Sequence, residues 1–562
     1  MTSGNELSRR SFLSRGAATG GLVMLGAGGA SVVAGCSSSP STSSAGTTPS
    51  SGSKPGINTG TPKKGGSATM ATAAEIDGFF PPSNHWDTNG FLYANTVYDP
   101  LMWVGADGTV QPYLAKSLTS NADSTVWTMT LRPGVKFSDG SDLTSTVVKN
   151  NFTVLAASAL TGTALKGITS VDTPDAMTVV YNLSAPRPAF AAGLTTQVGY
   201  VVAQSMLDQS AAGKTPDPIG TGPFVFSSWV PNDHFTATRN PNYWRSGYPH
   251  LDQITFRPIP DDTQRESTLK TGGVDLILTN SPVTMRDLTG QSQYQLVDSL
   301  TGVLGEPTVS FIMLNTVVAP TSDLRIRQAL AKSLNVKQIL KIFGGGFTQP
   351  INGIFLPGSP YYSSDTGYPA YDVAGAKALV NQYKAEHGTP SLTLATVTDP
   401  RLESVVQIIQ QMWNQVGFDV TVAAIQQATL ITDFITGKFQ AATSAQFGAV
   451  DPDINYVWFS TTTVSPVGGI GLNFARNSDP EIEFSLQSGR TTSDQSTRVV
   501  AYKKLNQRLA QDLPYLWLEQ YPFAVAGDQR VQNFAGLTLP SGAPGYGFDE
   551  GIIFPSQMWL NG

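Results

Sequence analysis

Cysteine is almost absent from this chain, whose 562 residues contain only Cys36. A single cysteine cannot form an intrachain disulfide, and it excludes the paired cysteines of CxxC chemistry. Histidine is also scarce, with four residues in the whole chain. None of them stands in an HExxH motif, so a zinc site of the usual spacing is not expected. The sequence therefore predicts no metal site and no cofactor.

Several motifs of common enzymes are missing as well. The chain has no G-x-S-x-G elbow, no GxxxxGK[ST] phosphate loop and no G-x-G-x-x-G dinucleotide fingerprint. Its Asp and Glu residues are scattered, and their spacing alone leaves a carboxylate-pair hydrolase open. No catalytic constellation stands out, so we expect a protein that is not an enzyme.

Charge is low and slightly acidic. Charged residues make up 14% of the chain and the net charge is −6. A nucleic-acid-binding protein would present a basic face, so no nucleic-acid partner is expected. Hydrophobic residues make up 40%, which suits a globular secreted protein.

The first 36 residues read as an export leader. Ser8-Arg9-Arg10-Ser11-Phe12-Leu13 matches the twin-arginine pattern, and a mildly apolar, Gly/Ala-rich stretch follows it. That stretch lacks the roughly 20 strongly apolar residues of a membrane span. Val33-Ala34-Gly35-Cys36 resembles the lipobox of bacterial lipoproteins, which implies cleavage after residue 35 and a lipid on Cys36. The alternative is a chance arginine pair before a disordered tail.

A low-complexity segment follows the leader. Residues 36–66 are rich in Ser, Thr, Gly and Pro, which cannot bury enough apolar area to offset the entropy of ordering. We expect a disordered tether there. The roughly 500 residues beyond it are too many for one core, so two or three domains are expected.

Local patterns place several elements of the body. Val126–Leu131 and 176–183 alternate as half-buried strands. Asp323 is predicted to cap a helix over 324–343, and Asp372 a helix over 373–387 that Gly388 ends. Strands and helices alternate in the second half, which predicts an α/β lobe.

Seven stretches that run in order from about Ala68 to the C-terminus resemble one family, the extracytoplasmic solute-binding proteins of peptide/nickel ABC importers, family 5. They are "VYDPLMWVGADGTVQPYLAKSL", "WTMTLRPGVKFSDGSDLTSTVVKNNF", "GTGPFVFSSW", "RNPNYWRSGYPHLDQITFRPIPD", "SFIMLNTVVAPTSDLRIRQALAKSLN", "GKFQAATSAQFGAVDPD" and "AYKKLNQRLAQDLPYLWL".

The resemblance implies an α/β, two-lobe periplasmic-binding-protein fold of the large cluster C type, with a hinged cleft. Lobe one would take residues 67–304 plus 526–562, with an inserted subdomain at about 104–214. Lobe two would take residues 305–525.

The resemblance also implies a function without covalent chemistry. Family members capture a solute between open lobes, close by a hinge motion and dock on an ABC permease and its ATPase. The expectation is a monomeric extracytoplasmic lipoprotein that binds a peptide or peptide-like solute. The alternative is a receptor for a glycan, a metal chelate or another non-peptide ligand, with a role in sensing or in the envelope.

In peptide-binding relatives, an Asp in a "W-x-x-D…DP" type loop of lobe two receives the peptide ammonium. Here the loop reads Gln446-Phe447-Gly448-Ala449-Val450-Asp451-Pro452-Asp453. Phe447 takes the Trp position, and the Asp position falls on or near Gly448 to Val450. Asp451 could replace the anchor, but a structural, loop-capping role is favoured. A ligand without a free amine is therefore expected.

Other candidate ligand contacts lie beside this loop and near the first strand. Phe447, Tyr456 and Trp458 could form an aromatic wall, although Tyr456 and Trp458 could instead belong to a buried helix start. Ile76, Asp77, Gly78 and Phe79 lie in the loop after the first strand, which borders the cleft in relatives. Asp77 is as well suited to cap that loop as to contact ligand.

Overall fold

A computed structural model describes residues 56–58, 60–300 and 303–561 of the chain. The predicted leader, Cys36 and most of the predicted tether lie outside the described residues. The last part of that tether contacts the body. The Gly56 carbonyl accepts a hydrogen bond from Ala535 N (2.9 Å), and Gly66 N donates to Asp252 Oδ2 (3.0 Å). A Cβ on Gly56 would lie 2.6 Å from Val297, so glycine permits this close approach.

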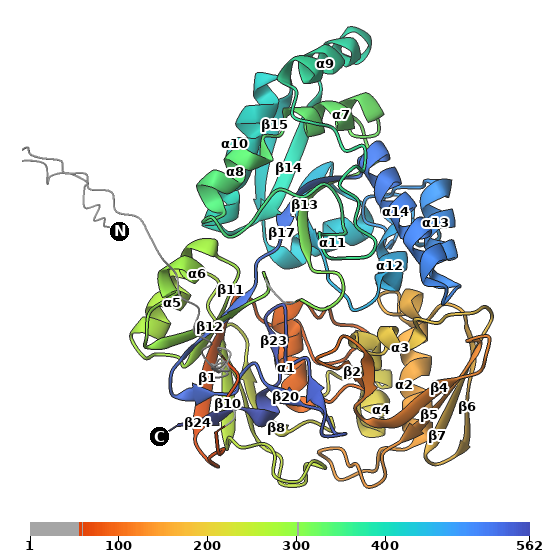
Figure 1. The fold of residues 1–562 in the computed structure, drawn as a ribbon, viewed down its shortest axis with the longest axis vertical. Helices are drawn as coiled ribbons and strands as arrows, with labels where there is room; N and C mark the ends of the chain where they lie inside the picture. The colour runs from red at the N-terminus through yellow and green to blue at the C-terminus, as the bar shows by residue number, and fades with distance from the viewer. Residues whose placement is uncertain (1–55, 59, 301–302, 562) are drawn as a thin grey trace, which may run out of the picture. The chain divides into compact units, whose positions relative to one another are not determined.

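A seven-stranded sheet forms the centre of lobe one, in the order β12-β18-β11-β1-β10-β9-β8. β1 is parallel to β10 and β11, and the remaining pairs are antiparallel. The strands are β1 (Ser67–Thr72), β8 (Phe224–Val230), β9 (His234–Arg239), β10 (Gln253–Pro258), β11 (Leu276–Thr279), β12 (Tyr294–Asp298) and β18 (Ala524–Asp528). The helices are α1 (Thr88–Val97), α5 (Asp262–Lys270) and α6 (Pro282–Leu288) (Figure 1).

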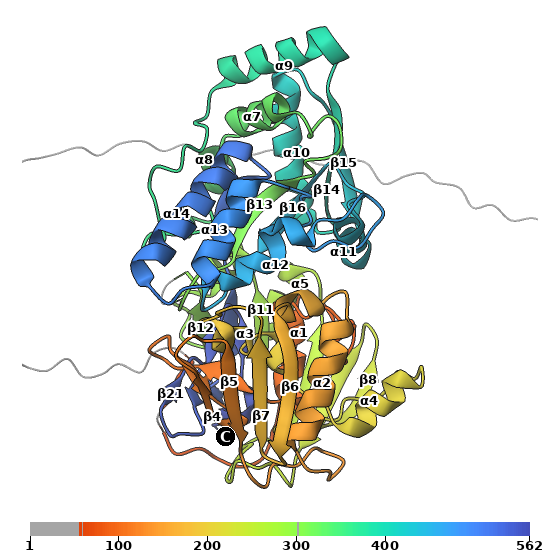
Figure 2. The same cartoon turned by 90° about the vertical axis from the view of Figure 1, so that its right-hand side faces the viewer.

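A second, smaller sheet lies within the range predicted for the inserted subdomain. It is antiparallel, in the order β4-β5-β7-β6, and α2 lies beside it (Figure 2). The elements are β4 (Ala115–Ser120), β5 (Val126–Leu131), α2 (Ser145–Ala157), η1 (Gly162–Leu165), β6 (Ile168–Asp175), β7 (Thr178–Leu183), α3 (Phe190–Gly193), η2 (Gln197–Gly199) and α4 (Gln204–Ala211). The inward side chains of β5, including Met129 and Leu131, pack with α2 in a core of their own.

Lobe two contains a five-stranded sheet in the order β15-β14-β16-β13-β17. Its strands are β13 (Val309–Leu314), β14 (Ser391–Val397), β15 (Asp419–Ile425), β16 (Ala441–Gln446) and β17 (Tyr515–Gln520). Its helices are α7 (Leu324–Ser333), α8 (Val336–Phe343), α9 (Val373–His387), α10 (Pro400–Gln415), α11 (Gln427–Thr436), η3 (Pro452–Ile454), α12 (Asn455–Phe459), η4 (Thr461–Thr463), α13 (Pro480–Arg490) and α14 (Gln495–Asp512). Two separate apolar clusters bury β13 side chains of alternating orientation, such as Ile312 and Phe311, so both faces of the sheet are covered.

Short ladders complete the fold near the C-terminus and beside the subdomain. They are β2 (Met102–Val104) with β3 (Val110–Pro112), β19 (Val531–Gln532) with β24 (Trp559–Leu560), β20 (Leu537–Thr538) with β21 (Pro544–Gly545), and β22 (Phe548–Asp549) with β23 (Ile552–Ile553), followed by η5 (Pro555–Gln557). Among the described residues, no helix has both the length and the apolar character needed to cross a bilayer.

The chain crosses between the lobes twice, after β12 and after β17. The two crossings are joined by hydrogen bonds, because Ser299 N donates to the Phe523 carbonyl (2.8 Å) and Gln520 Nε2 donates to the Ser299 carbonyl (2.8 Å). The return crossing comes slightly earlier than predicted, since Ala524 and Val525 already pair with β11 and β12. Two adjacent, hydrogen-bonded crossings are a suitable hinge.

Candidate ligand-binding site

The loop after β1 contributes mainly to the core of lobe one. Ile76 and Phe79 are buried, and the Phe79 ring stacks on Phe235 at a centroid distance of 5.1 Å. Asp77 accepts hydrogen bonds from His85 N (3.0 Å) and pairs with His85 Nδ1 (2.9 Å). Gly78 has a φ of +151°, and its carbonyl accepts from Trp86 Nε1 (3.0 Å). Through these contacts, Asp77 and Gly78 join the two ends of the loop between β1 and α1.

The loop after β16 lies against the entry to lobe two. Gly448 N donates to Thr308 Oγ1 (2.9 Å), and Ala449 and Glu306 exchange two backbone hydrogen bonds of 2.8 Å. A Cβ on Gly448 would lie 2.6 Å from the Glu306 carbonyl oxygen and 2.6 Å from Glu550 Oε2. Gly448 therefore serves close packing of three segments.

Glu550 joins this cluster from the C-terminal segment of lobe one. Its Oε1 accepts from Thr308 N (2.6 Å), and its Oε2 accepts from Thr308 Oγ1 (2.5 Å). Burial, with the nearby charge of Asp549, raises the pKa of Glu550 to about 8. Nothing in the spacing of the sequence pairs residue 308 with residue 550, so this contact between the lobes was not predicted.

Asp451 caps the short helix η3 and pairs with Arg498. Its Oδ1 caps η3 by accepting from Asp453 N (2.9 Å), and Arg498 Nη2 lies 2.7 Å from both carboxylate oxygens. The Arg498 side chain is only 6% exposed. Because both oxygens of Asp451 have protein partners, this carboxylate is poorly placed to receive a ligand ammonium.

Tyr456 is buried in the core of lobe two. Its hydroxyl accepts from Gln487 Nε2 (3.0 Å), and the Arg490 guanidinium lies 3.7 Å from its ring centroid. Phe447, in contrast, is 47% exposed and contacts Trp458 at a ring distance of 6.0 Å. Phe447 and Trp458 are the two predicted aromatic residues that the structure brings together beside a pocket.

A buried ion pair connects the subdomain to lobe two. Arg187, between β7 and α3, places Nη2 at 2.9 Å from Asp453 Oδ2, and Arg490 Nε lies 3.0 Å from Oδ1 of the same carboxylate. The Asp453 side chain is 4% exposed. Lys166 Nζ also donates to the Thr462 carbonyl (3.3 Å), again from the subdomain to lobe two. Arg187 and Asp453 are 266 residues apart in the chain, so no local sequence pattern predicts that they pair.

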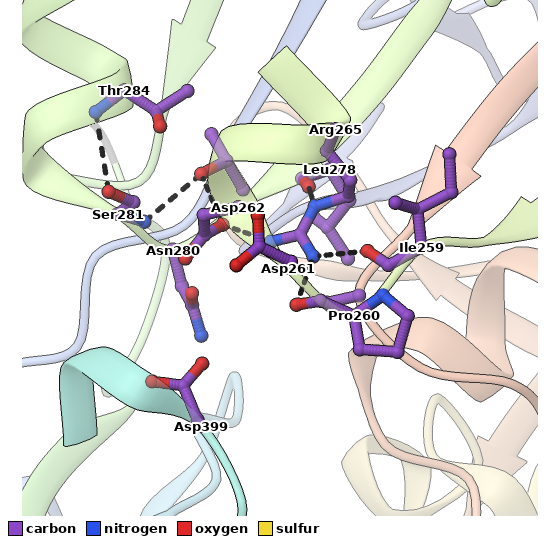
Figure 3. A network of polar contacts seen from close by, with 12 residues as sticks. Ile259, Pro260, Asp261, Asp262, Arg265, Leu278, Asn280, Ser281, Thr284 and Asp399 are labelled. Atoms are coloured by element: carbon purple, nitrogen blue, oxygen red, sulfur yellow. Dashed lines mark hydrogen bonds and ion pairs between the residues drawn. The ribbon is translucent and has the colours of Figure 1, made fainter. Parts of the chain in front are cut away.

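Charged residues of both lobes also face each other near the hinge. Buried Arg265 donates to the carbonyls of Leu278, Ile259 and Pro260 and pairs with Asp262 (Figure 3). Asp399, which caps α10 of lobe two, lies near Asn280 and Asp262 of lobe one (Figure 3). Burial raises the pKa of Asp262, and Asp399 adds to the rise, whereas Arg265 and Arg401 oppose it.

Metal-binding geometry is missing from the residues that the structure describes, where no three His, Cys, Asp or Glu side chains gather as a metal site would require. The residues described above provide hydrogen-bonding groups, aromatic surface and contacts between the lobes. These features suit reversible binding of a solute.

Comparison with known proteins agrees with this geometry. A family model described as "Bacterial extracellular solute-binding proteins, family 5 Middle" matches residues 109–465, more than half of the chain. The chain belongs to this family. The resemblance drawn from the seven sequence stretches is therefore confirmed.

Two relatives of this family 5 protein are named for different ligands. It is 26% identical to a glutathione-binding protein GsiB from Pectobacterium atrosepticum, over 81% of this chain and 89% of that protein. It is also 26% identical to a nickel-binding periplasmic protein from Escherichia coli K12, over 83% of this chain and 91% of that protein.

The fold is shared with solved structures. Helicobacter pylori DppA, solved in complex with the peptide STSA, superposes with a TM-score of 0.78 at 21% identity, covering 89% of this chain and 99% of DppA. The predicted fold class, a two-lobe α/β periplasmic binding protein, is confirmed by this likeness.

Proposed function

We propose that this protein is the solute receptor of an ABC importer, capturing a peptide or peptide-like solute between its lobes and delivering it to a permease and ATPase. Membership of family 5 carries this proposal. Its relatives are named for binding and not for catalysis, which agrees with a protein that is not an enzyme.

The hinge and the contacts between lobes supply a mechanism. Rotation at the paired crossings near Ser299 and Phe523 would separate Arg187 from Asp453 and Glu550 from Thr308. A solute stabilises the closed form only if it binds that form more tightly than the open form. Closure then creates the surface that the permease recognises.

The ligand class follows from the loop after β16. Peptide, glutathione and nickel appear in the names of similar proteins, so the family fold accepts several chemistries. Because Asp451 is held by Arg498, a peptide-like solute without a free amine fits this loop better than a simple dipeptide. A non-peptide solute such as a glycan or metal chelate, bound for sensing or envelope roles, is the second candidate.

Location follows from the leader. Twin-arginine export and a lipid on Cys36 would hold the monomeric receptor on the outer face of the cell membrane, close to its permease. Acyl anchoring normally needs more than one chain, as lipoproteins have.

Uptake by living cells tests this proposal. A strain lacking the gene is expected to lose uptake of a labelled, N-acetylated peptide digest, and the wild-type gene should restore it. Cys36→Ala is expected to release the protein from the membrane fraction and to restore less uptake, while purified protein still binds solute. Unchanged uptake in the deletion strain would contradict the import role.

A further inference from the structure

A carboxyl at the tip of a hairpin of lobe one reaches lobe two beside the hinge. Glu550 and Gly551 form the two-residue turn between β22 and β23, with φ of +50° and +91°. Such a turn favours Asn or Gly at its first position, because a long side chain is unfavourable in the left-handed region. The turn itself therefore gives no reason for glutamate at this position, whereas the contact of its side chain with lobe two does.

Lobe two buries this carboxyl. Glu550 is 6% exposed, and its two oxygens lie 2.6 Å from Thr308 N and 2.5 Å from Thr308 Oγ1. Gly448 packs so closely that a Cβ there would lie 2.6 Å from Glu550 Oε2. Because Thr308 and Gly448 both belong to lobe two, a hinge rotation that separates the lobes would expose the carboxyl to water. The burial of Glu550 is therefore a property of the closed form.

The charge around Glu550 is negative. In the described part of the chain, no ion pair joins its carboxyl to Lys, Arg or His. Asp549 precedes it on the same hairpin, and Glu306 and Asp451 lie on the lobe-two side, where Arg498 already pairs with Asp451 at 2.7 Å. A buried carboxylate without a counter-ion is costly in free energy, so the closed form favours the neutral acid.

The pKa values of this cluster agree with its geometry. Burial, followed by the charge of Asp549, raises the pKa of Glu550 to about 8. Burial also raises the pKa of Asp549 to about 6 and that of Glu306 to about 7. Tyr546 stays neutral, because burial and the charges of Asp549 and Glu550 raise its pKa further. In its protonated form, Glu550 Oε2 can donate to Thr308 Oγ1, so the contact between the lobes persists when the charge is lost.

We propose that closing the lobes takes up a proton at Glu550, so that an acidic exterior favours the closed form. The proposal rests on the solute-binding function proposed above and concerns the regulation of that function. As pH rises, Glu550 loses the proton and leaves an uncompensated negative charge in the contact, which favours the open form. The apparent affinity for solute falls with the fraction of closed chains.

The distance between the lobes measures closure without any solute. Cys36→Ala removes the only cysteine, so Asp123→Cys in the subdomain and Thr497→Cys on α14 can carry two spin labels. Pulsed electron paramagnetic resonance on this full chain should show the shorter, closed distance at pH 6. The closed-to-open ratio should be roughly ten- to one-hundred-fold lower at pH 9, because the pKa of about 8 in the closed form lies between these values.

Two results of this measurement would overturn the proposal. The first is a closed-to-open ratio that is the same at pH 6 and pH 9. The second is a chain that stays open at both pH values, because the contact between Glu550 and Thr308 would then not form.

Variants assign the effect to Glu550. In Glu550→Gln the amide can donate to Thr308 Oγ1 as the protonated acid does, so the ratio should not change with pH. Glu550→Asn, with a residue that such a turn favours, should keep the hairpin folded and give the same independence of pH. Asp217→Asn, at an exposed carboxylate, is the matched control and should follow the parent chain. A fall in both Glu550 variants equal to that in the parent chain would overturn the role of Glu550.

A second arm with an N-acetylated peptide digest separates this proposal from the receptor function. A ratio that the digest raises, and that is higher at pH 6 than at pH 9, supports both. A ratio that depends on pH but not on the digest supports proton uptake and contradicts capture of a peptide-like solute. A ratio that the digest raises equally at both pH values, without any change with pH, supports capture and overturns proton uptake.

Discussion

At the scale of single residues, buried carboxyls give the protein its distinctive chemistry. Glu550 holds Thr308 with both oxygens and Gly448 packs against it, so one carboxyl ties lobe one to the loop after β16 of lobe two. Burial also raises the pKa of Glu306 to about 7. Because only folding buries these carboxyls, their pKa values are raised in the folded chain and not in the unfolded chain.

This difference predicts a pH dependence of stability. The folded pKa of Glu550 is about 8 and its ordinary value is 4.5, so the unfolded chain releases the proton first as pH rises. The free energy of unfolding should therefore fall between about pH 5 and pH 8. In Glu550→Gln the side chain keeps its size and its hydrogen-bonding groups but no longer titrates. The fall in the free energy of unfolding should therefore be smaller by roughly 3 kcal/mol, which corresponds to two to three pKa units.

Urea unfolding at pH 5 and pH 8 measures the effect. Asp123→Asn, at an exposed carboxylate, serves as the control and should leave the fall unchanged. The same fall in Glu550→Gln as in the wild type would show that Glu550 is not the titrating group.

At the scale of elements, local sequence patterns predicted the strands and helix ends that depend on contacts between residues close together in the chain. Val126–Leu131 forms β5 with the expected alternation of burial, and the α9 helix begins at the Asp372 cap and ends at Gly388, whose φ is +80°. The helix expected over 324–343 is instead two helices, because Leu334 leaves the helical conformation and Asn335 caps α8 with a bond to Gln338 N. Apolar periodicity continues through this break, so the pattern alone could not show it.

The candidate site was less predictable than the elements. The cap that Asp451 forms on η3 could be predicted from its place before Pro452, since Asx capping is a local feature. Arg498, Arg187 and Glu550 became partners of the site only through folding over long sequence separations. The pocket at Phe447 likewise draws its walls from segments far apart in the chain.

The role of Asp451 in its loop leads to a direct test. Asp451→Ala should lower the free energy of unfolding by about 3 kcal/mol, because it leaves the buried guanidinium of Arg498 without its counter-charge. Adding Arg498→Leu should recover part of the loss. A ligand-anchoring Asp451 would behave differently, with normal stability in Asp451→Ala and loss of solute binding.

At the scale of the whole molecule, the proposed binding mechanism depends on the contacts that hold the lobes together. Arg187 and Lys166 reach from the subdomain to lobe two, and Asp453 keeps Arg490 as a second partner when Arg187 is removed. Lobe two should therefore remain folded in Arg187→Ala while the closed form loses a stabilising contact. A less populated closed form lowers the apparent affinity by the same factor.

Native mass spectrometry of the full chain, incubated with an N-acetylated peptide digest, tests solute capture most directly. The wild type should retain small-molecule adducts that denaturation releases. Arg187→Ala should retain fewer, and Arg325→Ala, which breaks only surface pairs with Asp323 and Glu386, should match the wild type. A wild-type chain that carries no adduct, either as purified or after incubation, would contradict a receptor that closes on a peptide-like solute.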